Sequence, residues 1–259
     1  MRPLIGVLSA ALLLTGCTAP ASDATFPAGG RPDYQLGGSY DPPAGVAIVA
    51  RDSLEKPAPG VYSICYVNGF QTQPGEEWPD ALLLHTPQGD PFLDPNWPDE
   101  TLIDISTAEK RHQAADRIGA AVERCATSGF DAVEFDNLDS FTRSDGLLTE
   151  DDAIAFAQLL VKEAQDHGLV AGQKNTPQLG DRGPEIGFTF AVAEECARYR
   201  ECAAYTEVYG DRVIDIEYAD DLDRSFAEIC ADPETPASTI LRDRDLVPAG
   251  EPDYVYEHC

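Results

Sequence analysis

The sequence contains few basic residues: 18 Lys and Arg stand against 46 Asp and Glu, which gives a formal net charge of −28 at pH 7. A surface of this charge repels nucleic acid and anionic membrane surfaces, so we expect neither as a partner. Solubility or salt adaptation is the commoner reason for such a charge, although it also attracts cationic ligands by long-range steering.

The sequence also lacks the patterns of a metal site or a repeat protein. It has no C-x-x-C motif, and its four histidines, His85, His112, His167 and His258, are scattered along the chain. Structural zinc sites usually draw ligands from closely spaced pairs, so we expect no metal ion. No stretch recurs at a solenoid period, which argues against a repeat architecture.

Long hydrophobic runs are absent except at the N-terminus. Arg2 precedes the apolar residues 4–14, and Thr15, Gly16 and Cys17 follow them. The run is too short to span a bilayer, and this order of segments is typical of a secretory signal peptide over residues 1–16. Leu-Thr-Gly-Cys also resembles a bacterial lipobox, with an ordinary signal peptide as the alternative. We therefore expect an exported protein that a lipid on Cys17 anchors to the cell membrane, facing outside the cytoplasm.

The mature chain would start at Cys17 and carry a charge of −28 − 1 = −29, because Arg2 leaves with the signal peptide. Residues 17–30 are rich in Ala, Pro, Ser and Gly, which predicts a flexible tether. No comparable linker follows, so we expect residues 31–259 to form one large domain that acts as a monomer.

Besides Cys17 the chain has six cysteines, at positions 65, 125, 196, 202, 230 and 259. An even number in an exported chain predicts three disulfides, for which 15 pairings are possible. Cys196 and Cys202 are close enough in sequence to pair with each other, which would leave the other four to join distant segments.

Strand-like runs bounded by turn residues alternate with helical patterns along this domain. The clearest helices cover residues 107–128 and 149–167, the second with Thr149 as N-cap and Gly168 after its end. This alternation predicts an α/β protein with a single (β/α)8 TIM barrel, with a doubly wound open sheet as the alternative. Residues 102–105 could form a further short strand. The eight expected strands cover residues 34–37, 46–50, 61–67, 132–136, 170–175, 188–193, 213–218 and 239–243.

The stretch GFDAVEFDNLDSF, residues 129–141, carries the strongest functional signal. Val133 and Phe135 fall on one face of its strand, whereas Glu134 and Asp136 fall on the other. Burying carboxylates is costly unless they are paired, hydrogen-bonded or protonated, so this strand is a candidate acid/base site. A strand that runs out into a solvated loop is the alternative interpretation.

Polar side chains also end the neighbouring strands. Because the active site of a TIM barrel lies at the carboxyl ends of its strands, we expect these side chains to meet at one site. They are Asn68, Asp136, Asn137, Lys174, Asn175, Glu194, Glu195 and Glu217.

Four segments, taken in order, resemble glycoside hydrolase family 114, the endo-α-1,4-polygalactosaminidase-like TIM barrels. They are GFDAVEFDNLDSF, GLVAGQKN (residues 168–175), AVAEECARYREC (191–202) and VIDIEY (213–218). The resemblance implies a hydrolase of an α-linked, galactosamine-containing polysaccharide that needs no cofactor.

On this resemblance Asp136 and Glu194 are the catalytic carboxylates, one as proton donor to the leaving oxygen and the other as nucleophile or base. Strand alternation alone lets either Glu194 or Glu195 face the substrate. Alternation also predicts that Glu217 points into the barrel. The expected substrate-binding residues are Asn68, Glu134, Asn137, Lys174, Asn175, Glu195 and Glu217.

The chain lacks the Trp-rich first strand and the Tyr-x-x-Trp-Arg-x-Asp segment that members of this family usually carry. Tyr34, Tyr66, Trp78 and Trp97 are the available replacements as platforms for sugar rings. A barrel that binds polysaccharide without cutting it is therefore the alternative function, and hydrolysis of an unrelated glycan is a third.

Overall fold

The computed structural model describes residues 25–259 of the chain. The predicted signal peptide, Cys17 and the first part of the expected tether lie outside these residues. Among the helices of residues 25–259, none is both long and apolar enough to cross a membrane.

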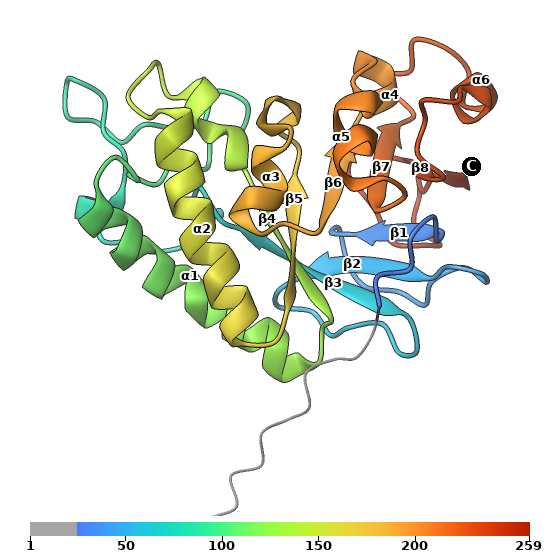
Figure 1. The fold of residues 1–259 in the computed structure, drawn as a ribbon, viewed down its shortest axis with the longest axis horizontal. Helices are drawn as coiled ribbons and strands as arrows, with labels where there is room; N and C mark the ends of the chain where they lie inside the picture. Colours follow the sequence, from blue (N-terminus) through green and yellow to red (C-terminus); the bar gives the residue numbers. More distant parts are fainter. Residues whose placement is uncertain (1–24) are drawn as a thin grey trace, which may run out of the picture.

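Eight parallel strands pair in chain order and curl into a barrel, and a ninth pairs antiparallel with the eighth (Figure 1). This order confirms the predicted α/β barrel and contradicts the doubly wound alternative. Residues 102–105 add no barrel strand, since Leu102 and Ile103 make only isolated antiparallel bridges. The strands are β1 (Pro32–Gln35), β2 (Ile48–Asp52), β3 (Tyr62–Asn68), β4 (Ala132–Asp136), β5 (Val170–Lys174), β6 (Phe190–Glu194), β7 (Val213–Tyr218), β8 (Ser238–Arg242) and β9 (Tyr256–His258).

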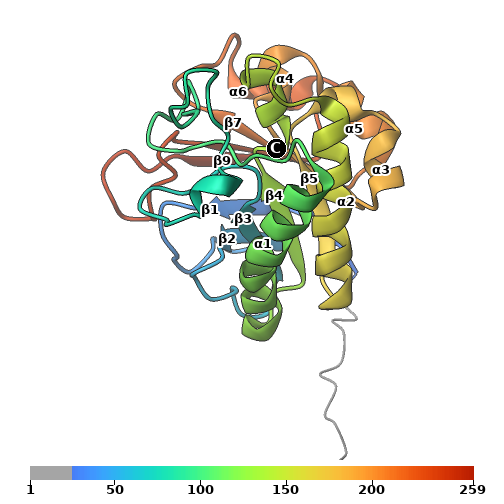
Figure 2. The same ribbon diagram turned by 90° about the vertical axis from the view of Figure 1, so that its left-hand side faces the viewer.

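The helices outside the barrel form an incomplete ring. Figures 1 and 2 show α1 and α2 side by side along one flank of the sheet. A full (β/α)8 ring has a helix after every strand. Within residues 25–259 no helix follows β1, β2 or β8, so this ring is incomplete. The helices are η1 (Asp80–Leu82), α1 (Ala108–Ser128), η2 (Leu138–Arg143), α2 (Glu150–Asp166), η3 (Pro177–Leu179), α3 (Arg182–Ile186), α4 (Cys196–Tyr199), α5 (Cys202–Tyr209) and α6 (Phe226–Ala231), where η marks 3₁₀ helices.

Capping residues explain why the two long helices begin where the sequence predicts. The side chain of Thr107 accepts a hydrogen bond from the backbone of Lys110 at the start of α1. Thr149 and Asp152 form a capping box at the start of α2, in which each side chain bonds the other residue's backbone N–H. These bonds satisfy N–H groups that have no partner inside the helix.

Side chains close the barrel between its first and last strands. No ladder joins β1 to β8 in the described part of the chain, which leaves backbone groups of β1 to be satisfied in another way. Side chains of Ser238, Tyr256 and Arg242 donate to backbone carbonyls along the β1 edge, those of Gly30, Pro32 and Tyr34. These bonds hold β8 and β9 against β1 and complete the wall of the barrel.

The N-terminal end of the barrel is closed by a segment that the sequence assigned to the tether. The ring of Phe26 stacks on Phe190 at 4.9 Å and meets Tyr62 edge-on at 5.4 Å between centroids. Gly172 leaves room for Phe190, because a Cβ there would lie 2.3 Å from its ring. The end of the segment that the sequence assigned to the tether therefore packs against the barrel.

Three disulfides are present, as the cysteine count predicts, and one of them is the expected Cys196–Cys202 bond. Cys65 on β3 is joined to Cys125 on α1, which ties the barrel to its longest helix. Cys230 on α6 is joined to Cys259, which fixes the C-terminal strand β9.

Candidate active site

A cleft with a volume of about 410 Å³ lies at the carboxyl ends of the barrel strands. Its position agrees with the place where barrel enzymes carry their active sites. Three of the nine predicted site residues, Asn68, Glu134 and Glu217, do not line it. The six that do are Asp136, Asn137, Lys174, Asn175, Glu194 and Glu195.

Lys174 holds the centre of this site. Its side chain is only 1% exposed, and its Nζ atom lies 3.3 Å from Oδ2 of Asp136 and 3.1 Å from Oε2 of Glu194. These two oxygens can therefore be at most 3.3 + 3.1 = 6.4 Å apart. Burial alone would lower the pKa of Lys174, but the charges of Asp136 and Glu194 outweigh it and raise that pKa well above its usual value. Lys174 is thus a permanently charged bridge between two carboxylates.

Asp136, the last residue of β4, is oriented by three donors. Tyr66 on the adjacent strand β3 donates its hydroxyl to Oδ2 at 2.7 Å, which is the oxygen that also contacts Lys174. The backbone N–H of Asn137 donates to Oδ1 at 2.7 Å. Hydrogen bonds to both oxygens fix the direction of the carboxyl group.

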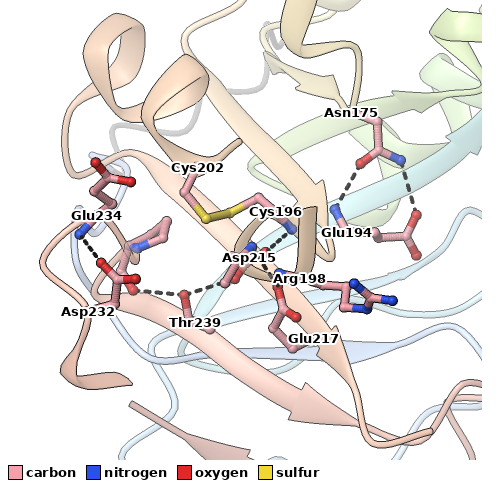
Figure 3. Close-up of a disulfide and its surroundings, with 12 residues drawn as sticks. Asn175, Glu194, Cys196, Arg198, Cys202, Asp215, Glu217, Asp232, Glu234 and Thr239 are labelled. Atoms are coloured by element: carbon pink, nitrogen blue, oxygen red, sulfur yellow. Dashed lines mark hydrogen bonds between the residues drawn. A yellow bond between two sulfur atoms is a disulfide. The ribbon is translucent and has the colours of Figure 1, made fainter. Parts of the chain in front are cut away.

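Glu194, the last residue of β6, is held in a similar way. Asn175 donates its amide to Oε2 at 3.2 Å and accepts from the backbone N–H of Glu194 at 2.8 Å (Figure 3). The hydroxyl of Tyr218 donates to Oε1. Burial by itself would raise the pKa of Glu194, but Lys174, Tyr218 and Asn175 together hold that pKa below its ordinary value.

Left-handed backbone at the ends of β4, β5 and β6 turns the chain sharply away from the cleft. Asn137, Asn175 and Glu195 have φ angles of 63°, 45° and 61°. Non-glycine residues adopt this conformation at an energetic cost, and such strain collects at functional sites. The turns leave the last side chain of each strand, that of Asp136, Lys174 or Glu194, facing the cleft.

The turn at Glu195 also separates the roles of the two neighbouring glutamates. Glu194 shares the inward face of β6 with Phe190 and Val192, which pack in the barrel interior. Glu195 leaves the strand pattern, and its Oε1 accepts from Arg244 at 3.0 Å at the rim of the cleft. Of the two, only Glu194 contacts Lys174.

Glu134 lies beneath the site and does not face the cleft. It is fully buried on β4, one inward position below Asp136. Burial raises the pKa of Glu134 to about 8, an effect that nearby Lys174 only partly offsets. Glu134 therefore does not line the cleft, where the sequence placed it as a substrate-binding residue, and its raised pKa favours the protonated form.

Asn68 and Glu217 also lie outside the cleft, although the sequence predicts that both bind substrate. Asn68 donates to Glu100 at 3.0 Å and accepts from the side chain of Asn137 at 3.0 Å, so it supports the cleft wall instead of lining it. Glu217 points to the outside of the barrel, because Ile214 and Ile216 take the inward face of β7. Its Oε1 accepts from the backbone N–H groups of Ala197 and Arg198 (Figure 3).

Several functional side chains were not predicted as site residues. Tyr218 contacts Glu194, and the sequence offered no signal for it, because alternation had placed Glu217 on the inward face in its stead. Arg143 donates to the side chain of Asn137 at 3.1 Å and to buried Asp94 at 2.7 Å, which braces the turn after Asp136. No sequence spacing indicates that contact, since 49 residues separate Arg143 from Asp94.

One group of described residues has the spacing of metal ligands, namely Cys196, Cys202 and Asp215. Its two cysteines are joined in a disulfide and so offer no thiolate.

Comparisons with known proteins agree with this geometry. The profile of glycoside hydrolase family GH114 matches residues 14–259. The fold is similar to that of Ega3 from Aspergillus fumigatus, solved in complex with galactosamine, with a TM-score of 0.72 and 23% identity over 94% of this chain and 100% of that one.

A second solved structure shares the fold at lower similarity. The glycoside hydrolase domain of PelA from Pseudomonas aeruginosa has a TM-score of 0.58 and 13% identity, over 85% of this chain and 97% of that one. No curated protein sequence matches the chain. Since the family profile spans nearly the whole sequence, the chain belongs to glycoside hydrolase family GH114.

Proposed function

We propose that the protein is an exported hydrolase of α-linked, galactosamine-containing polysaccharide, and that Asp136 and Glu194 are its catalytic carboxylates. The observation that carries this proposal is the buried Lys174 between these two groups at the base of the cleft. Glycoside hydrolysis requires two such carboxyl groups on either side of the scissile bond.

The shared contact of the two carboxylates with Lys174 supports a retaining reaction. Inverting enzymes keep their carboxyl groups about 6.5–9.5 Å apart to admit water, whereas retaining enzymes keep them about 5–5.5 Å apart. The two oxygens that contact Lys174 lie at most 6.4 Å apart, a limit that includes the separation of retaining enzymes. One carboxylate would then attack the anomeric carbon while the other, protonated, gives its proton to the leaving oxygen.

The charges of the site allow one of the two carboxylates to take up that proton. Burial favours the neutral form of Glu134, so the carboxylates that pair with Lys174 are those of Asp136 and Glu194. If either carboxylate gains a proton when substrate excludes water, Lys174 remains paired with the other. One carboxyl group can therefore act as the acid while the other stays ionised, and the charge of Lys174 remains paired throughout.

Negative charge around the cleft suits a cationic amino sugar. Six acids and three bases line the cleft, which gives it a formal charge of 3 − 6 = −3; the acids are Glu100, Asp136, Asp139, Glu194, Glu195 and Asp245, and the bases are Arg143, Lys174 and Arg244. Ega3, which shares the fold, was solved with galactosamine bound. The formal charge of −28 adds long-range attraction for a partly deacetylated polymer.

Export and anchoring belong to the same proposal. The basic and apolar N-terminus followed by Cys17 supports a lipoprotein on the outer side of the cell membrane, where an extracellular polysaccharide is accessible. The three disulfides favour such an oxidising location.

The test is to incubate the purified domain with partially deacetylated galactosaminoglycan, and to measure new reducing ends and binding in parallel. We expect both, with fully acetylated polymer cut more slowly because it lacks cationic groups. Binding without new reducing ends would instead support a polysaccharide-binding barrel that has lost catalysis. Absence of both would point to a different glycan.

A further inference from the structure

Two acids on β7 take no part in the chemistry proposed above. Asp215 and Glu217 are both fully buried, and neither lines the cleft. Figure 3 shows them near the Cys196–Cys202 disulfide and Arg198. Because two buried carboxyl groups so close together are costly, their hydrogen-bond partners indicate what they do.

Those partners are consecutive backbone N–H groups of the turn that follows Glu194. Cys196 donates its N–H to Oδ1 of Asp215 at 3.1 Å. Ala197 and Arg198 donate theirs to Oε1 of Glu217 at 2.8 and 3.3 Å. The N–H of Glu195 donates to the β7 carbonyl of Ile216 at 2.8 Å. Every N–H from residue 195 to residue 198 therefore donates to β7.

The same turn is held from two further directions. The Cys196–Cys202 disulfide closes it covalently six residues on. Thr239 on β8 donates its hydroxyl to the other oxygen of Asp215 at 3.2 Å, which fixes that carboxyl against the sheet. The left-handed residue Glu195 thus has little freedom to relax towards an ordinary conformation.

The opposite face of β7 holds the side chain of Glu194 itself. Tyr218 follows Glu217 directly, points inward and donates its hydroxyl to Oε1 of Glu194. Strand β7 therefore fixes Glu194 in two ways. On the inner side of the barrel it binds the carboxylate of Glu194, and on the outer side it binds the backbone that follows Glu194. A shift of the turn would move Glu194 relative to Lys174.

We propose that Glu217, assisted by Asp215 and the Cys196–Cys202 disulfide, is a positioning residue that fixes the turn at Glu195 and thereby directs Glu194 at Lys174 and Glu195 at Arg244. This inference deepens the proposed function, on which it rests for the catalytic role of Glu194. Glu217 does not contact substrate. Burial raises the pKa of both Asp215 and Glu217, and the charge of Glu217 raises that of Asp215 further.

The test compares Glu217→Met, which removes the acceptor but keeps the length of the side chain, with Glu217→Gln, which keeps one acceptor oxygen. The primary measurement is the titration of the Glu194 carboxyl carbon by ¹³C NMR, which does not depend on activity. We expect Glu217→Met to raise the pKa of Glu194 towards its ordinary value, because its contacts with Lys174 and Tyr218 lengthen. Glu217→Gln should leave that pKa close to the wild-type value.

Activity gives the second measurement. In Glu217→Met kcat should fall by roughly 100-fold with KM little changed, since a displacement of about 1 Å is enough for such a loss. Asp131→Asn is the matched control, because Asp131 also accepts a backbone N–H, that of Ser63 at 2.8 Å, at the opposite end of the barrel. It should change neither the titration of Glu194 nor kcat.

The outcomes separate the two proposals. If the wild type does not cut the polymer but Glu217→Met still shifts the Glu194 titration, the proposed function fails and the positioning role stands. An unchanged titration and unchanged kcat in Glu217→Met would overturn the positioning role. If Glu217→Met does not fold, the Cys196→Ser/Cys202→Ser double variant loosens the same turn, and an unmoved Glu194 titration in it would also overturn the proposal.

Discussion

Replacing Asp136 by Asn, or Glu194 by Gln, should each lower kcat by at least about 1,000-fold, because an amide can neither attack the anomeric carbon nor exchange the catalytic proton. The fold should survive, since each amide keeps the shape of the carboxyl group it replaces. Polymer binding should remain near the wild-type level. Steady-state kinetics and circular dichroism on the purified variants check these expectations.

Asp131→Asn provides the control for this pair, since it removes an acid just before the same strand, β4, but at the far end of the barrel. Its kcat should stay close to that of the wild type. Turnover above about one tenth of the wild-type rate in either Asp136→Asn or Glu194→Gln would remove that residue from the catalytic pair.

Replacing Lys174 by Met should both destabilise the fold and abolish activity. Removing one partner of a buried ion pair typically costs about 3–5 kcal/mol at neutral pH, because the other partner is left buried and uncompensated. Lys174 is buried against two such partners, Asp136 and Glu194. Chemical denaturation measures the loss of stability, and we expect kcat to fall by more than about 100-fold.

The effect of Lys174→Met on stability should depend on pH in a defined direction. Without the ammonium group, burial is left to raise the pKa of Glu194 above its unfolded value. The folded variant then binds protons that the unfolded chain has released, so its stability falls as the pH rises above about 4. The difference from the wild type should therefore be largest at pH 7 and shrink on acidification towards pH 4.

Lys162→Met is the matched control, because Lys162 also pairs with a carboxylate, that of Asp166, but with its side chain 67% exposed. Surface pairs of this kind contribute about 0–1 kcal/mol. If Lys174→Met were no more destabilising than Lys162→Met, the charge bridge at the base of the cleft would not have the importance that we give it.

The sequence predicted the elements that carry the site better than the direction of individual side chains. Asp136, Lys174 and Glu194 follow apolar runs directly, and the rule that barrel sites lie at the carboxyl ends of strands brought them together correctly. The N-caps at Thr107 and Thr149 could be predicted because a cap depends only on residues next to it in the sequence. The missing helices after β1 and β2 leave no such local signal.

Glu217 shows why alternation fails for a barrel strand. Both faces of β7 are buried, one in the barrel interior and the other against α4 and α5, so apolar residues do not identify the outer face. Alternation correctly separated Asp215 and Glu217 from Ile214 and Ile216, but it could not say which set faces inward. Glu194 and Glu195 were ambiguous for a related reason, since the left-handed turn at Glu195 has no signature in the sequence.

The most direct test of the central claim, that two carboxylates held by Lys174 cleave the polymer with retention, is the anomeric form of the first product. Wild-type protein would digest partially deacetylated galactosaminoglycan in an NMR tube, with spectra recorded before the new reducing ends mutarotate. We predict that the α-anomer appears first, because double displacement at Asp136 and Glu194 preserves the configuration of an α-linkage. Initial release of the β-anomer would contradict the account.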